Sequence, residues 1–244
     1  MSHPIVMAGG NITIGDHRGV VHLPGLGTVD LDVVWTSALA AIVIMTLGFM
    51  MKRKLTSGVP GKLQLFWEFV TEQVSDLTDS AIGPQGRKFV GLGVTIFFFI
   101  LLCNWIAFIP TGDPGWFPPP TSDVNLPLAM ALTVVALLHH QSIKARGLKK
   151  YFKHYSTPYA AMTPINVIEE ITKPITLTFR LFGNIFSGLL MISVIVTLLP
   201  VYASWIGLVV WKPFDELFIG AIQAFIFALL TIIYLGLGMS TDEH

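Results

Sequence analysis

The chain has 244 residues, of which 53% are hydrophobic and 12% are charged, about half the charged share of an ordinary soluble domain. This composition excludes a disordered chain and argues against a soluble fold. Fifteen Lys and Arg residues balance fifteen Asp and Glu residues, and the zero net charge argues against a nucleic-acid-binding protein, which needs a basic excess.

Residues 1–30 lack the basic start and the early apolar core of a cleavable signal peptide. We therefore expect an exported N-terminal tail. Its glycines, its prolines and its alternating Val and Leu residues favour a loop or a short hairpin.

Residues 31–244 are predicted to form a single membrane domain, because long charge-free stretches alternate with charged segments. A hydrocarbon core of roughly 30 Å needs about 20 helical residues. The last two stretches exceed that length, so their helices should be long and tilted. The fold class is an all-α membrane protein with five membrane-spanning helices, at about 31–51, 89–110, 123–143, 164–200 and 207–239.

Two of the segments that connect the first three spans have distinctive sequence patterns. Residues 61–82 repeat apolar side chains at helical spacing with acidic residues elsewhere, which predicts an amphipathic helix at the cytoplasmic membrane surface or against a partner. Residues 110–122 are dense in proline, which predicts a loop on the outside.

The basic residues predict the orientation. Eleven Lys and Arg residues lie in the segments that follow spans one and three, whereas Arg18 and Lys212 fall on the opposite side. Cytoplasmic loops near spans hold the excess of positive charge. The N-terminus is therefore expected outside and the C-terminus in the cytoplasm.

Arg180 lies in the apolar sequence TLTFRLFGN of span four. If the helix opens near 163–164, about fifteen residues at about 1.5 Å each place Arg180 deep in the bilayer. An arginine there costs roughly 2.5–3.5 kcal/mol, so a compensating function is expected. The alternative is a span that begins near residue 178, with Arg180 as an interfacial anchor.

Polar side chains share the face of span four that carries Arg180, because they recur at spacings of three, four or seven. These residues and the leucine between them are Glu169, Lys173, Leu177, Asn184 and Ser187. Such a stripe of polar side chains is typical of a water-filled path that a fixed positive charge interrupts. Glu170 lies about a quarter turn away, and for both acids an ordinary acidic first turn is the alternative.

Span five carries a second polar face, with Glu216, Gln223 and Tyr234 separated by seven and eleven residues. Asp215 stands beside Glu216, and the alternative for this pair is a solvated helix start capped by Asp215. Gln223 lies deeper, where a path is favoured over plain packing. Asp123, ahead of span three, is either an N-cap or a proton relay at the outer mouth.

Several familiar chemistries are not indicated. The one cysteine, Cys103, lies in an apolar run, so neither a disulfide framework nor a cysteine metal site is expected. His139 and His140 are adjacent and point to different faces, which makes a metal site a weak alternative. GPQGRK at 83–88 does not satisfy the phosphate-binding loop pattern, and no cofactor is expected.

Two late segments, TKPITLTFRLFGNIFSG around Arg180 and IQAFIFALLTIIYL around Gln223, closely resemble subunit a of bacterial F-type ATP synthases. DVN ahead of span three, PINVIEEITKP ahead of the arginine and the count of five spans agree with this family. The resemblance covers roughly residues 30–240.

The resemblance implies a non-catalytic stator subunit in the plasma membrane. It would pack beside a ring of c subunits, each with one carboxyl group, and against b-type subunits of the peripheral stalk. Protons would enter from outside through one half-channel, protonate a ring carboxylate, and leave through a second half-channel to the cytoplasm. Arg180 matches the family's essential arginine between the half-channels, and Asn184 and Gln223 match its polar neighbours.

The chain departs from the family's pattern at one of a pair of positions, Leu189, and keeps an acid at the other, Glu216. Many members carry an acid five residues beyond the asparagine, where this chain has Leu189, and a histidine or acid seven before the glutamine, where it has Glu216. The outer half-channel would then keep Glu216, assisted by Asp215 and Asp123. Glu169 and Glu170 would lie toward the cytoplasmic half-channel.

Two other function classes are alternatives. A self-contained secondary transporter usually shows an internal repeat, which is not found here. A membrane scaffold would use Arg180 only to pair helices.

Overall fold

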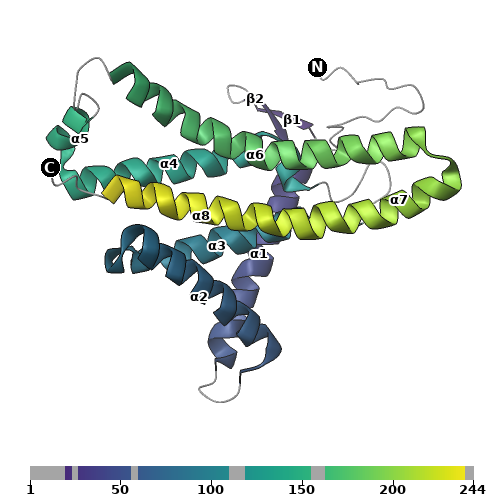
Figure 1. Ribbon diagram of the computed structural model, residues 1–244, viewed down its shortest axis with the longest axis horizontal. Helices are drawn as coiled ribbons and strands as arrows, with labels where there is room; N and C mark the ends of the chain where they lie inside the picture. The colour runs from purple at the N-terminus through teal and green to yellow at the C-terminus, as the bar shows by residue number, and fades with distance from the viewer. Residues whose placement is uncertain (1–19, 24–26, 56–59, 110–118, 155–162, 240–244) are drawn as a thin grey trace.

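The computed structural model describes residues 20–23, 27–55, 60–109, 119–154 and 163–239 (Figure 1). Within these ranges it contains five helices that are long and apolar enough to cross a membrane, which confirms the predicted all-α membrane fold. These candidate spans are Leu31–Arg53, Gly86–Ile106, Asn125–Arg146, Thr163–Leu198 and Val201–Gly238.

A two-stranded antiparallel hairpin leads into the first helix. Strands β1 (Val20–Leu23) and β2 (Gly27–Asp30) pair with Val20 opposite Asp30, and α1 (Leu31–Lys54) follows directly. The hairpin agrees with the loop-or-hairpin prediction for this part of the tail. The remainder of the predicted tail, at 1–19 and 24–26, lies outside the described residues.

After α1 the chain forms α2 (Lys62–Ile82), the short 3₁₀ helix η1 (Pro84–Phe89) and α3 (Val90–Ile106). One face of α2 buries Val70 and Val74, and Trp67 stacks on Phe98 of α3 with ring centroids 4.4 Å apart. One face of the helix thus packs on the bundle, and its amphipathic character stays a prediction. Its position at the cytoplasmic surface stays a prediction.

The core is built around α8 (Gly220–Met239), which packs against α2, α3 and α4 (Asn125–Arg146). Its buried side chains include Phe227 and Ile232, which belong to the same hydrophobic cluster as Phe97 and Ile100 of α3. The close approach of α3 needs a small residue, because a Cβ on Gly93 would lie 2.9 Å from both Ile232 and Val74. Part of the proline-rich loop, 110–118, is not described; residues after it form the 3₁₀ helix η2 (Pro120–Ser122).

A long helical hairpin crosses this core. α6 (Thr163–Leu198) has 36 residues, which is about 54 Å and well beyond the roughly 30 Å of a hydrocarbon core, so it must tilt. The return arm consists of α7 (Val201–Pro213), the π-helical segment η4 (Phe214–Ile219) and α8. Figure 1 shows the two arms running antiparallel along the long axis, while α1 crosses them steeply.

The structure corrects the predicted start of span five. The helix begins at Val201 rather than at 207, because Pro200 is its N-cap and Ser204 donates a hydrogen bond back to the Leu199 carbonyl oxygen at 2.9 Å. We call the end where α6 meets α7 the hairpin end. The opposite end carries the short helix α5 (Leu148–His154), which the sequence analysis did not predict, and we call it the α5 end.

Substituting Gly93 by leucine should destabilise the helix core. The added side chain would enter the contact of α3 with α2 and α8, and such overpacking costs about 1–3 kcal/mol. Gly91→Leu is the matched control, because a Cβ at Gly91 meets nothing within 4 Å. Thermal melting of the two variants in detergent should show a lower melting temperature for Gly93→Leu alone; equal melting temperatures would contradict the packing described.

Candidate functional site

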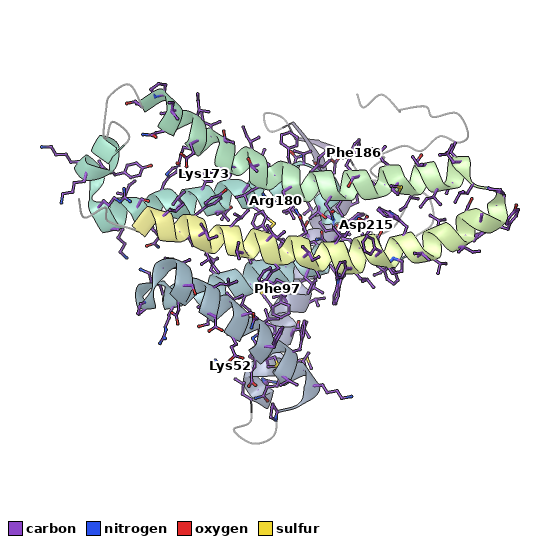
Figure 2. All side chains as sticks on the ribbon, in the orientation of Figure 1. Lys52, Phe97, Lys173, Arg180, Phe186 and Asp215 are labelled. Atoms are coloured by element: carbon purple, nitrogen blue, oxygen red, sulfur yellow. The ribbon has the colours of Figure 1, made fainter. Side chains whose placement is uncertain are left out.

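Arg180 is a half-buried charge without a counter-charge in the described part of the chain. It lies on α6 between Leu177 and Leu181, which are fully buried, and Figure 2 shows it between the ribbons of α6 and α8. Among the described residues it makes no ion pair and no side-chain hydrogen bond. The helix begins at Thr163, so the alternative of a span starting near residue 178 is wrong.

Asp215 and Glu216 are buried inside the return arm. Their exposed fractions are 6% and 9%, and both lie in the π-helical segment η4, more than three helical turns after Val201. The alternative of a solvated helix start capped by Asp215 is therefore wrong. The Glu216 carboxylate has one cation near it, Lys212, with Nζ 4.0 Å from Oε1.

The two arms of the hairpin meet where Asp215 faces Gly188 of α6. A Cβ at Gly188 would collide with the Asp215 carboxylate, so only glycine leaves room for the acid there. Figure 2 shows Asp215 in the strip between the arms. Gly188 directly precedes Leu189. The Asp215 carboxylate of the return arm therefore lies close to a position of α6 that carries no acid.

Two side chains of α3 hold the π-helical segment. The Asn104 amide donates to the Gly220 carbonyl oxygen at 3.1 Å, and the Trp105 indole donates to the Leu217 carbonyl oxygen at 3.4 Å. The side-chain amide oxygen of Asn104 in turn accepts a 3.2 Å hydrogen bond from the Thr121 hydroxyl. π-helical segments occur mostly at functional sites. The sequence analysis missed Asn104, although an amide within the apolar run IFFFILLCNWIAFIP was a visible signal.

The predicted polar face of span five carries Glu216 in the π-helical segment, and Gln223 and Tyr234 further along on α8. Gln223 is 8% exposed, and neither its Nε2 nor Glu216 Oε2 has a hydrogen-bond partner among the described residues. An unsatisfied buried polar group costs about 1–3 kcal/mol. These two buried atoms are compatible with the predicted path, which stays a prediction.

A second polar cluster lies at the α5 end and joins α6 to α8. Lys173 pairs with Glu170 at 2.7 Å and with Glu169 at 3.8 Å, and its Nζ lies 5.9 Å from the ring centroid of Tyr234 on α8. The two acids are the seventh and eighth residues of α6, so the alternative of an acidic first turn is wrong. Glu170 is the more buried acid, and Glu169 is exposed.

Other candidate residues do not join these clusters. Asp123 accepts hydrogen bonds from the Asn125 backbone N–H at 2.9 Å and from its amide at 3.1 Å, which is a local helix-start contact. Asn184 is half-buried on α6 beyond Arg180. Within the described ranges, no group of three or more His, Cys, Asp and Glu side chains is placed to hold a metal ion.

Comparison with known proteins gives consistent matches over most of the chain. Residues 33–236 match the family described as ATP synthase A chain. ATP synthase subunit a of Acidothermus cellulolyticus is 45% identical, over 96% of this chain and 85% of that protein. ATP synthase subunit a of Mycobacterium ulcerans is 43% identical over 95% of both, and that of Bacillus subtilis is 33% identical over 88% of this chain and 95% of its own.

Replacing Gly188 by alanine should weaken the contact between the arms. The methyl group would occupy the place of the Asp215 carboxylate, and we expect a loss of about 1–3 kcal/mol in the free energy of unfolding. Gly183→Ala, on the same helix with open space around it, should be neutral or slightly stabilising. Adding Asp215→Ala to Gly188→Ala should recover stability in a melting experiment; no recovery would contradict the contact.

Proposed function

Starting from the fact that the chain belongs to the ATP synthase subunit a family and is a membrane-sector subunit of the F-type enzyme, we propose that it is the proton-conducting stator. In this proposal it forms two offset half-channels against a rotating ring of c subunits and couples proton flow to rotation. It makes no ATP itself. The observation that carries the proposal is Arg180, a guanidinium inside the membrane domain with no described carboxylate beside it.

An unpaired arginine at this depth needs a partner from outside the chain. A guanidinium stays protonated at any workable pH, and a charge left unpaired in a low-dielectric environment is costly. A ring carboxylate passing Arg180 supplies the missing partner and is driven to its ionised form, so it must release its proton before it passes. The fixed charge also blocks direct proton flow between the half-channels.

The outer half-channel runs along the return arm in this proposal. Glu216 and Gln223 have buried polar atoms without described partners, which water and a moving proton would satisfy. Asp215 adds a second carboxylate next to Gly188, and Asn184 stands on α6 beyond Arg180. Asp123 is the candidate for the outer half-channel with the least support, because its described hydrogen bonds are both to Asn125.

The inner half-channel begins at the α5 end. Glu169, Glu170 and Tyr234 surround Lys173 there, and Glu169 is exposed. This end faces the cytoplasm in the proposed orientation, with the N-terminus outside and the C-terminus inside the plasma membrane. Each proton that crosses releases about 2.3 kcal/mol per 100 mV, which drives the ring.

Exposed apolar side chains give the ring and other subunits a surface to pack against. Phe179 on α6 and Phe214 and Phe218 on η4 are 62%, 47% and 59% exposed. An uncovered apolar surface of this kind suits lipid or the helices of neighbouring subunits. We assign the arms of the hairpin to the c-ring, and other faces to b-type subunits of the peripheral stalk and to lipid.

Arg180→Ala should leave assembly of the complex intact and abolish proton-driven ATP synthesis. Arg180→Lys should also fail, because lysine loses its proton more readily when desolvated. Arg87→Ala is the control, since Arg87 pairs with Asp79 at an exposed site and such pairs contribute little. Native gels and ATP synthesis by membrane vesicles measure both properties. Substantial coupled synthesis in either Arg180 variant would refute the stator mechanism, and failed assembly would favour a scaffold.

Glu216→Gln should slow passive proton flow through the membrane sector, because the amide keeps the shape of the side chain but cannot carry a proton at this position. Asn125→Ala should leave the flow nearly unchanged, since its side chain contacts only Asp123 among the described residues. Proton uptake into vesicles stripped of the soluble sector measures both rates. Equal rates would remove Glu216 from the outer half-channel.

A further inference from the structure

His139 on α4 connects the acidic cluster of α6 to α5. Its Nδ1 lies 3.6 Å from Glu170 Oε1 and 2.8 Å from the Tyr151 hydroxyl. The His139 side chain is about one-third exposed and that of Glu170 about one-fifth, so the imidazole is the more solvent-exposed of the two groups. The adjacent His140 is exposed and has no described partner.

The groups around His139 come from each helix packed against this end of α4. Helix α5 contributes Tyr151, and α6 contributes Glu170, with Lys173 behind it. Helix α8 contributes Tyr234, which lies beside Lys173 rather than His139. Glu170 is therefore the charged group closest to the imidazole, and Lys173 holds its other oxygen, Oε2, at 2.7 Å.

We propose that His139 is the proton relay that carries protons from Glu170 out of the inner half-channel to the cytoplasm. Histidine is the side chain whose ordinary titration falls between about pH 5 and 8, so it can accept and release a proton under cellular conditions. The salt bridge from Lys173 to Oε2 leaves Oε1 of Glu170 directed at His139. A small side-chain movement, or one water, closes the 3.6 Å gap to hydrogen-bond length.

The relay balances without any further reactant. A proton delivered by a ring carboxylate protonates Glu170, and the O–H bond then breaks as the proton moves to the ring nitrogen of His139. The resulting imidazolium releases one proton to cytoplasmic water. Ionised Glu170 and neutral imidazole are restored, with one proton taken up and one released in each cycle.

This inference rests on the proposed stator function, and the experiment separates the two. Vesicles stripped of the soluble sector carry His139→Gln or, as a matched control, His140→Gln, and proton flow is measured while the pH on the cytoplasmic face is varied. His139→Gln should lower the flow by about tenfold, less than the 10²–10⁴ of a positioned acid–base group because water carries part of the flow. It should also weaken the dependence of the flow on the cytoplasmic pH, because glutamine has no titratable proton, and His140→Gln should change neither the flow nor that dependence.

A small-molecule rescue distinguishes a relay from a structural histidine. His139→Ala leaves space beside Glu170, and added imidazole should restore proton flow if the ring carries protons. Normal flow in His139→Gln, no rescue of His139→Ala by imidazole, or failure of the His139 variants to assemble would each overturn the relay. Loss of coupling in Arg180→Ala alongside normal flow in His139→Gln would refute the relay alone, whereas coupled synthesis in Arg180→Ala would refute the stator function itself.

Discussion

The structure depends on one electrostatic constraint, a permanently charged guanidinium held within an apolar helix bundle. Arg180 cannot lose its proton, and the described part of the chain offers it no carboxylate. Such a charge is tolerated where another molecule supplies the counter-charge. The proposed partner, a carboxylate of another subunit, agrees with membership of the family described as ATP synthase A chain.

The helical hairpin arranges the remaining polar groups on either side of that charge. Toward the hairpin end, the π-helical segment buries Asp215 and Glu216, and Gly188 lets the arms approach closely. Toward the α5 end, Lys173 gathers two acids, with His139 and Tyr151 beyond them. The two clusters differ in kind: the first has polar atoms without described partners, and the second is a connected network.

The sequence analysis predicted the five spans and the polar faces because helical periodicity and charge segregation are local properties of the chain. It placed the start of span five six residues too late, since the helix begins directly after Pro200. The alternative in which Asp215 caps a solvated helix start is wrong because the helical arm runs from Val201 through Asp215 without a break. The sequence analysis also missed α5, which is too short to leave a periodic pattern.

By itself, the sequence determined the membrane class and the two long apolar helices, and it singled out Arg180 as a candidate, since an isolated charge in an apolar stretch is costly wherever that stretch packs. Only the tertiary structure decided which residues from different helices meet. The contact of Gly188 with Asp215, the support of the π-helical segment by Asn104, and the approach of His139 to Glu170 join residues far apart in the chain. Helical spacing gives the face on which a residue lies, but the packing of one helix against another selects its partner.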